Sequence, residues 1–478
     1  MKYNLPKEVQ TLLENFRKNN FQIYIVGGAV RNLIMNQPVN DWDFTTDAKP
    51  EEVLKLFPDA HYDNKFGTVG IQLSDKKQKK SDDRRLWAPE GEDDSTFEIT
   101  TMRKEGLYKD SRHPIDVSWT NKIEEDLGRR DFTINAIALT TSHVIASKAK
   151  QSHKKDDKWV LIDPFHGEKD IENKLVRAVG DPNLRFEEDA LRLMRAIRIA
   201  TELEFEIEEK TFSAIKKNAK GITDIAWERI RDELFKLLFS NNPSAGILKL
   251  RDSGILQIIL PELEKCFGIV QEGPKHDRVY DIGEHSMMSL KFTPSKDPLV
   301  RLASLLHDIG KPDTVKISPD GNVTFYNHDF IGGKLILKLA DRFNLSKKQT
   351  DKLFKLVRWH MFSVSENQTD SAIRRFIKNV SQDYIEDIMA IRVGDRLGGG
   401  TQTETSWRIE TFKERIKEVL RKPFSISDLK VNGKDVMKEL KIKPGPKVGE
   451  VLQKLFAEVL EDDSKNTREY LLNRIKHL

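Results

Sequence analysis

The sequence lacks the features that define several large classes of protein. Its 478 residues contain one cysteine, Cys266, which excludes an intramolecular disulfide and a zinc site built from several cysteines. Residues 23–30 are among the longest apolar runs and include two glycines, whereas a membrane-spanning helix needs about 20 apolar residues. The first residues have no apolar signal-peptide core. We therefore expect a cytoplasmic protein with no membrane partner.

The chain also has little net charge. Lysine and arginine number 80 and aspartate and glutamate 76, so the formal charge of +4 indicates little about partners. Hydrophobic residues make up 38% and charged residues 33%, a balance typical of a globular chain with a buried core. At about 100–200 residues per domain, the length predicts about two to four domains.

The N-terminal third combines strands with short helices. Residues 21–26 are β-rich and lead through two glycines into a helical stretch at 29–35. Further β-like segments lie at residues 41–44, 67–73, 97–102 and 134–139. They predict a small mixed α/β domain over residues 1–165. Two polar inserts interrupt this domain, at about 74–95 and 142–158, and we interpret both as surface loops without assigning a function.

The rest of the chain has helical periodicity. Apolar residues recur at helical spacing in segments such as 190–198 and 228–238. Turn-rich stretches at 268–283 and 397–400 separate the helical segments. The expected fold class is therefore α+β and multidomain, with a helical neck at 166–270, a second helical domain at 283–397 and a helical tail at 405–478.

An acidic pair follows the glycine turn. Asp41 and Asp43 are two residues apart in a predicted strand, so their side chains point to the same face. Glu98 offers a third carboxylate from another strand. Oxygen ligands of this kind suit Mg²⁺, and two such ions support in-line displacement at phosphorus. The backbone N–H groups of Gly27 and Gly28 stand before a helix, where such groups bind phosphates. Together these residues predict a phosphoryl-transfer site.

Several motifs resemble one enzyme family. Residues 26–33 (VGGAVRNL), 41–44 (DWDF) and 126–136 (DLGRRDFTINA) resemble the class II tRNA nucleotidyltransferases, which are the CCA-adding enzymes and the bacterial poly(A) polymerases. The resemblance continues through residues 161–167 (LIDPFHG) and 185–192 (RFEEDALR), and more weakly through 228–234. It covers about residues 20–240 and implies a polymerase-β-like nucleotidyltransferase head.

The resemblance implies a role for each matching residue. It makes Asp41 and Asp43 the Mg²⁺ ligands. The residues that would hold the sugar and triphosphate of the nucleotide are Arg129, Arg130, Asp131 and Asn135. The residues of the phosphate-side turn are Gly27, Gly28 and Arg31. Residues 108–114 resemble the flexible loop of the family. Within them, Arg112 would help to arrange the head for catalysis. Asn32 is a departure, because the family usually has aspartate there.

A carboxylate and a guanidinium at helical spacing can select bases. Asp189 and Arg192 lie three residues apart in a strongly helical segment, so they share a face. Cytosine and adenine both present an amino donor beside a ring-nitrogen acceptor, whereas guanine and uracil present a carbonyl and an N–H. An unpaired buried polar group costs about 1–3 kcal/mol, which disfavours the wrong bases. Spacing alone more often indicates a surface ion pair, but the resemblance implies the base-selecting role.

Histidines cluster in the second helical domain. Imidazoles and carboxylates spread over several helices suit one or two divalent transition metal ions that activate water for phosphoester hydrolysis. His285, the adjacent His307 and Asp308, and Asp395 resemble the signature of HD-domain phosphohydrolases. His328 and His360 lie where two-metal members of that family carry further ligands.

The combined interpretation is a CCA-adding tRNA nucleotidyltransferase with an HD domain and a tail that binds tRNA. Its expected substrates are CTP, ATP and the tRNA 3′ end, Mg²⁺ is its expected cofactor, and no protein partner is inferred. HD domains of some bacterial CCA-adding enzymes act as phosphatases or cyclic phosphodiesterases. The alternatives are a poly(A) polymerase, an enzyme that adds only CC or only A, and an HD phosphohydrolase whose head only binds RNA.

Overall fold

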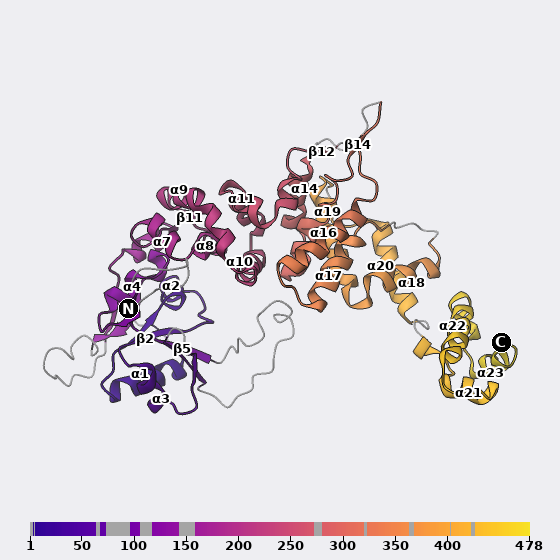
Figure 1. Ribbon diagram of the computed structural model, residues 1–478, viewed down its shortest axis with the longest axis horizontal. Coiled ribbons are helices and arrows are strands. Elements are labelled where there is room, and N and C mark those ends of the chain that lie inside the picture. Colours follow the sequence, from indigo (N-terminus) through magenta and orange to yellow (C-terminus); the bar gives the residue numbers. More distant parts are fainter. Residues whose placement is uncertain are drawn as a thin grey trace. The chain divides into compact units, whose positions relative to one another are not determined.

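The computed structural model describes residues 3, 5–63, 67–72, 96–105, 117–142, 158–271, 280–319, 323–362, 368–401, 403–421 and 426–478 (Figure 1). The chain forms two compact units. Unit 1 comprises Met1–Lys265, Lys296–Leu299 and Ala340–Leu345, and unit 2 comprises Cys266–Ser295, Val300–Leu339 and Ser346–Leu478. Arg112 and nearly all of both polar inserts lie outside the described residues.

Unit 1 begins with a seven-stranded sheet of order β3-β4-β5-β2-β1-β8-β9. Its strands are β1 (Ile23–Val26), β2 (Asp43–Thr46), β3 (His61–Asp63), β4 (Thr68–Gln72), β5 (Thr96–Thr101), β8 (Ala138–Thr141) and β9 (Trp159–Ile162). Neighbouring strands are antiparallel except β2 and β5, which are parallel. All four residues of β1 are buried, so both faces of this central strand are covered, as its unbroken apolar sequence predicts.

Short helices accompany the sheet. They are α1 (Lys7–Lys18), α2 (Gly28–Ile34), α3 (Pro50–Leu56), α4 (Ile123–Gly128) and α6 (Gly167–Glu172). In α1, Val9, Leu12, Leu13 and Phe16 are buried, which is the helical spacing of one apolar face. The two predicted strands 41–44 and 134–139 start later than expected. The first begins at Asp43, and a 3₁₀ turn at Thr133–Asn135 replaces the start of the second.

The neck of unit 1 is helical. Its helices are α7 (Pro182–Glu188), α8 (Leu191–Leu203), α9 (Glu209–Asn218), α10 (Trp227–Phe239), α11 (Pro243–Asp252), α12 (Leu256–Ile259) and α13 (Pro261–Glu264). A two-stranded sheet joins β10 (Leu175–Val176) to β11 (Glu206–Ile207). Leu193, Met194, Ile197 and Ala200 are buried along α8, so its opposite face is left to arginines.

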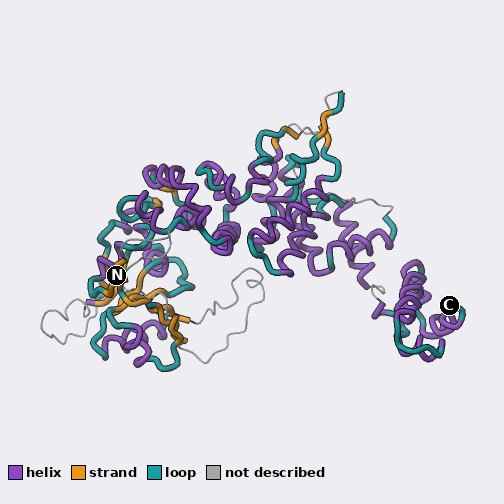
Figure 2. Tube along the Cα trace, in the orientation of Figure 1, coloured by secondary structure: helices purple, strands orange, loops and turns teal. Residues whose placement is uncertain are grey.

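Unit 2 is mainly helical (Figure 2). Its helices, some of which begin or end in unit 1, are α14 (Ile282–Phe292), α15 (Pro298–Leu306), α16 (His328–Arg342), α17 (Lys347–Arg358), α18 (Asp370–Val380), α19 (Ile385–Gly398) and α20 (Trp407–Arg421). Two short ribbons pair β12 (Val270–Gln271) with β13 (Tyr280–Asp281) and β14 (Lys316–Ile317) with β15 (Val323–Thr324). Gly394 and Gly398 of α19 face α14, where an added Cβ would lie 2.2 Å from Thr293 Oγ1 and 2.5 Å from Ser289 Oγ. The missing side chains therefore allow the two helices to approach closely.

The C-terminal helices of unit 2 have a core of their own. They are α21 (Gly433–Leu440), α22 (Pro446–Glu461) and α23 (Arg468–Lys476), and the core includes Val436, Leu455 and Leu471. The expected fold class, a mixed α/β head followed by helical regions, is confirmed. Among the described residues, no helix combines the length and apolar character that crossing a membrane requires.

Candidate functional sites

Three carboxylates lie on the same face at the parallel strand pair of the head. Asp41 precedes β2 and is exposed, Asp43 is the first residue of β2, and Trp42 between them is buried. This alternation puts Asp41 and Asp43 on the same face. Glu98 of β5 is also exposed and is the register partner of Asp43. Side chains at partner positions of parallel strands point to the same face, so Glu98 lies beside Asp43.

The electrostatics of this cluster suit a bound cation. Burial and the charge of Asp41 raise the pKa of Asp43 to about 6, although Arg130 and Arg195 act in the opposite direction. Two carboxylates that repel each other at a partly buried position are stabilised by a divalent ion with oxygen ligands. The donor set therefore fits Mg²⁺.

The glycine turn lies against the same carboxylate. Gly27 has φ +72° and ψ −143°, a conformation that essentially only glycine adopts. A Cβ at this position would lie 3.0 Å from Asp43 Oδ2 and 3.3 Å from Arg130 Nη1. Gly28 follows as the first residue of α2, and a Cβ there would lie 3.4 Å from Arg31 Nη2. The predicted glycine turn, Asp43 and Arg130 are thus brought together.

A hydrogen-bond chain links the glycine-turn helix to the neck. Arg31 Nη1 donates to Asn135 Oδ1 at 2.7 Å, and Asn135 Nδ2 donates to Asp131 Oδ1 at 3.2 Å. Arg195 of α8 donates to Asp131 Oδ2 from Nε at 2.9 Å and from Nη2 at 2.7 Å. Burial alone would raise the pKa of Asp131, but Arg195 holds it at about 2. Asn32 Oδ1 accepts from Arg31 Nε and Nη2, so this departure from the family pattern still orients the arginine.

The predicted base-selecting residues are adjacent but do not pair with each other. Asp189 has an extended backbone between α7 and α8, so the expectation of one continuous helix through Asp189 and Arg192 is wrong. Asp189 Oδ1 accepts the N–H of Leu191, and Oδ2 lies 3.1 Å from Arg229 Nη2. The helix is interrupted here because the aspartate side chain accepts a hydrogen bond from a backbone N–H at the start of α8.

Arg192 points back toward the head. Its Nη1 donates to Glu188 Oε2 at 2.6 Å and to the carbonyl of Arg185, and its Nη2 donates to the carbonyl of Arg129 at 3.1 Å. The predicted selecting residue therefore borders the predicted nucleotide-binding segment.

Three partners in this region were not predicted. They are Arg195, Arg229 and Asp126. The basic series at positions 192, 195 and 198 of α8 was the available signal for Arg195, because residues three apart share a helix face. The i,i+3 spacing of Asp126 and Arg129 was the corresponding signal for that pair, whereas no local pattern indicates the partner of Asp189.

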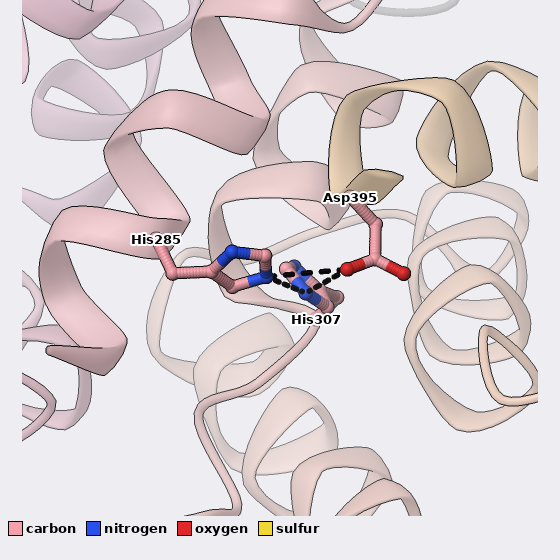
Figure 3. Close-up of side chains that lie close together, drawn as sticks. All are labelled: His285, His307 and Asp395. Atoms are coloured by element: carbon pink, nitrogen blue, oxygen red, sulfur yellow. Dashed lines mark hydrogen bonds and ion pairs between the residues drawn. The ribbon is translucent and has the colours of Figure 1, made fainter. Parts of the chain in front are cut away.

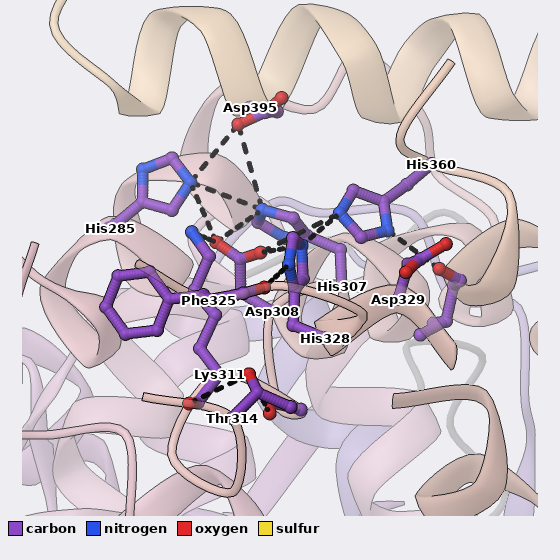
Figure 4. A network of polar contacts seen from close by, with 12 residues as sticks. His285, His307, Asp308, Lys311, Thr314, Phe325, His328, Asp329, His360 and Asp395 are labelled. Carbon is purple, nitrogen blue, oxygen red and sulfur yellow. Dashed lines mark hydrogen bonds and ion pairs between the residues drawn. The ribbon is translucent and has the colours of Figure 1, made fainter. Parts of the chain in front are cut away.

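Six predicted metal ligands converge in unit 2 (Figure 3, Figure 4). They form two sets, one of His285, His307 and Asp395 and the other of Asp308, His328 and His360. They come from α14, α19, the start of α16 and the residues that follow α15 and α17.

Asp308 joins the two sets of ligands. Its Oδ2 lies 3.2 Å from His307 Nε2 and 3.6 Å from His285 Nε2. Its Oδ1 lies 3.3 Å from His328 Nε2 and 3.7 Å from His360 Nε2. One oxygen therefore faces each set, so Asp308 would offer one ligand atom to a metal ion held by either set.

The outer ring nitrogens fix the histidine tautomers. His307, His328 and His360 each place Nδ1 2.7–2.8 Å from a backbone carbonyl, of Ser304, Phe325 and Val357 respectively. A carbonyl only accepts, so Nδ1 carries a proton, and in the neutral imidazole the Nε2 lone pair faces the centre. The Nε2 atoms of His285 and His307 lie 3.2 Å apart, and those of His328 and His360 lie 3.3 Å apart. Lone pairs that converge so closely fit divalent metal ions.

Charge in this cluster is already balanced. Burial alone would raise the pKa of Asp308, but His307 and Lys311, whose Nζ lies 2.6 Å from Oδ2, hold it well below its ordinary value. Burial and the charge of His307 lower the pKa of His360 to about 4, so its imidazole is neutral at pH 7. A neutral imidazole is the form that binds a metal.

Models of known families match most of the chain. A model described as the poly A polymerase head domain matches residues 23–177, and an HD domain model matches residues 278–390. Two more, for an RNA-binding segment of poly(A) polymerase and for domain 2 of tRNA nucleotidyltransferases, match residues 204–267 and 381–475.

Similar curated proteins are CCA-adding enzymes and an A-adding tRNA nucleotidyltransferase. The CCA-adding enzyme of Ligilactobacillus salivarius is 31% identical over 99% of this chain and 98% of its own length. The A-adding tRNA nucleotidyltransferase of Deinococcus radiodurans is 34% identical over 70% of this chain and 74% of its own. Among solved structures, the Bacillus stearothermophilus CCA-adding enzyme in complex with CTP is similar with a TM-score of 0.68 at 23% identity, over 99% of this chain and 98% of that one.

Proposed function

Because the chain belongs to the class II tRNA nucleotidyltransferase family of CCA-adding enzymes, here with an HD domain, we propose that it adds C, C and A to the 3′ end of tRNA. In this reaction the 3′-hydroxyl of tRNA attacks the α-phosphate of CTP or ATP, and pyrophosphate leaves. Relatives similar over nearly their whole length support the proposal. A CCA-adding enzyme is described in complex with CTP, and another with ATP.

The observation that carries this proposal is the pairing of Asp43 with Glu98 across the parallel strands, with Asp41 on the same face and the Gly27 turn against Asp43. Asp41 and Asp43 would hold Mg²⁺, which supplies positive charge for the attacking hydroxyl and the leaving pyrophosphate. The missing Cβ of Gly27 lets the turn lie close to Asp43, and the guanidinium of Arg130 lies beside it.

Base selection is assigned to Asp189 and Arg192. A carboxylate accepts the exocyclic amino group of cytosine or adenine, and a guanidinium donates to the neighbouring ring nitrogen. Arg229 orients the carboxylate of Asp189, and Glu188 orients Arg192. The hydrogen bond from Arg192 to the carbonyl of Arg129 fixes the distance between this pair and the segment proposed to hold the sugar.

We also propose a division of labour along the chain. The head at residues 1–165 carries out the transfer, the neck at 166–270 selects the base, the HD domain spans 283–397 and the tail at 405–478 binds tRNA. A Thermotoga maritima CCA-adding enzyme complexed with tRNA, similar with a TM-score of 0.55 at 19% identity over 98% of this chain and 95% of that one, supports the assignment of tRNA as substrate.

Incorporation of labelled nucleotides tests the proposal. The chain is incubated with Mg²⁺ and a tRNA that lacks its 3′ CCA. Addition of CCA followed by termination is expected. An open-ended A tail would indicate a poly(A) polymerase, and addition that stops after CC would indicate a CC-adding enzyme. No addition to this tRNA, together with addition of A to a tRNA that already ends in CC, would indicate an A-adding enzyme, and no incorporation into either tRNA would contradict nucleotide transfer. The Asp43→Ala variant should add nothing, and retained addition would contradict the metal assignment.

The alternatives are not favoured. The A-adding relative covers 70% of the chain, whereas CCA-adding relatives cover up to 99%. A head that only binds RNA would have no use for three clustered carboxylates, because they repel a phosphate backbone in the absence of cations.

A second activity is proposed for the HD centre on the six converging ligands. They would hold one or two divalent transition metal ions, which generate a water-derived nucleophile for phosphoester hydrolysis. Metal content measured by mass spectrometry and hydrolysis of bis-p-nitrophenyl phosphate test this activity. Asp308→Asn should lower both without affecting CCA addition, and Asp43→Ala should leave both unchanged. Hydrolysis that survives Asp308→Asn would refute the assignment.

A further inference from the structure

Asp126 of α4 is a fully buried carboxylate that contacts two nucleotide-site arginines. Its relative exposure is 0%. Its Oδ1 accepts from Arg129 Nε at 2.9 Å and from the backbone N–H of Arg103 at 3.3 Å. Its Oδ2 lies 3.5 Å from Arg130 Nη2. Since the carboxylate is buried, it cannot itself touch a nucleotide.

The contact of Asp126 with Arg130 connects it to the proposed metal-binding carboxylates. Arg130 Nη1 lies 3.3 Å from the Cβ position of Gly27, and the same position is 3.0 Å from Asp43 Oδ2. The guanidinium is thus held between Asp126 on one side and the Gly27 turn with Asp43 on the other. A shift of Arg130 would change the positive charge felt by Asp43 and by any phosphate at the turn.

The contact of Asp126 with Arg129 connects it to the proposed base-selecting Arg192. Arg129 ends α4, and its side chain is bound to Asp126. The carbonyl of Arg129 accepts from Arg192 Nη2 at 3.1 Å. Asp126 therefore fixes the residue whose main chain orients the selecting guanidinium.

We propose that Asp126 is a positioning residue that sets both the charge beside the metal-binding carboxylates and the orientation of the base-selecting Arg192. The inference rests on the proposed nucleotide addition and deepens it. It predicts that one buried carboxylate, out of contact with the substrate, controls catalytic rate and nucleotide choice together. A residue that only stabilised the fold would lower the amount of active protein equally for every nucleotide.

The test compares Asp126→Asn with the wild-type full-length chain. The amide has the same shape but no negative charge. We expect kcat/KM for CTP to fall by about a hundredfold, because small displacements of positioning groups have effects of that size. Discrimination between CTP and UTP should fall by about tenfold or more, the size of one hydrogen bond to a charged group. Thermal unfolding and titrated active fraction correct for any loss of folded protein.

Asp387→Asn is the matched control. It removes the carboxylate that lies 2.8 Å from the nearly buried Lys352, in unit 2, and should leave CTP addition and discrimination unchanged. Arg130→Gln removes only the contact next to Asp43 and leaves the contact between Asp126 and Arg129. It also tests the proposal if Asp126→Asn does not fold. It should lower the rate of addition while leaving the CTP to UTP ratio unchanged.

Three outcomes would overturn the positioning role. They are an Asp126→Asn variant that keeps the wild-type kcat/KM for CTP, an Asp126→Asn variant that loses equally for CTP and UTP and so keeps wild-type discrimination, and an Arg130→Gln variant that loses discrimination or keeps the full rate. Failure of the wild-type chain to add nucleotides would instead refute the proposed function, so the two hypotheses are tested separately.

Discussion

Asp43 is proposed to bind a cation as a carboxylate, so its raised pKa should make Mg²⁺ binding depend on pH just below neutrality. With a pKa of about 6, Asp43 is mostly ionised at pH 7 and about one-tenth ionised at pH 5. The apparent affinity for Mg²⁺ should therefore fall by about tenfold over this interval. An aspartate with an ordinary pKa of about 3.9 would stay mostly ionised throughout and show almost no change.

The same shift affects stability without metal. A pKa raised from 3.8 to about 6 means that the folded chain favours the protonated form. The contribution of this shift to the free energy of unfolding is complete below pH 3.8 and is lost as the pH rises through 6. The loss lowers the free energy of unfolding by up to about 3 kcal/mol. In the absence of metal, Asp43→Asn should therefore raise the thermal midpoint of unit 1 by a few degrees at pH 7 and by little at pH 4.

Calorimetric Mg²⁺ titration at pH 5, 6 and 7 measures the effect. The background variant is Asp308→Asn, which removes the bridging ligand of the HD centre, and Asp43→Asn in that background serves as the blank. Equal Mg²⁺ affinity at pH 5 and pH 7 would refute the reasoning, because it would show that burial and Asp41 do not shift the ionisation of Asp43.

Other contacts lead to separate predictions. Gly27→Ala should cost about 1–3 kcal/mol in backbone strain and abolish most nucleotide addition, measured by incorporation with thermal unfolding as the control; full activity would contradict the close approach to Asp43. Arg229→Ala removes the partner of Asp189 and should reduce CTP over UTP discrimination by about tenfold in single-nucleotide kinetics, whereas unchanged discrimination would exclude a positioning role. His328→Ala should lower the bound transition metal by about one ion per chain with CCA addition unaffected, and unaltered metal content would remove His328 from the ligand set.

Local sequence pattern predicted those elements of the fold that depend on local interactions. The apolar run before Gly27 forms β1, and the following helix begins one residue earlier than expected. The parallel pairing of Asp43 with Glu98 was not predictable, because 55 residues and a polar insert separate them and register depends on contacts across the sheet. Glu98 was nonetheless chosen correctly as a residue of a neighbouring strand.

The helix break at Asp189 shows a limit of periodicity. Residues 185–198 have continuous apolar spacing and favour one helix, but the Asp189 carboxylate accepts the N–H of Leu191 and the backbone turns extended. Short polar side chains compete with helical hydrogen bonds in this way, and spacing does not record which of them will do so. The partners of buried charges escape prediction for a related reason. Arg229 lies 40 residues from Asp189, so only the folded neck joins them.

The two acidic centres differ in how their charge is balanced, and this difference bears on their chemistry. In the head, Asp43 keeps a raised pKa beside Asp41, so the cluster remains short of positive charge until a cation binds. Such a site suits ions that arrive and leave with each nucleotide. In the HD centre, the charge of Asp308 is already balanced by Lys311, and carbonyl partners hold three imidazoles in the ligand tautomer. Preorganised nitrogen ligands favour a transition metal that stays bound between turnovers. Binding requires little reorganisation of the side chains, and release of the metal loses much binding free energy. We therefore expect the two centres to bind different ions, so that removal of one does not impair the other.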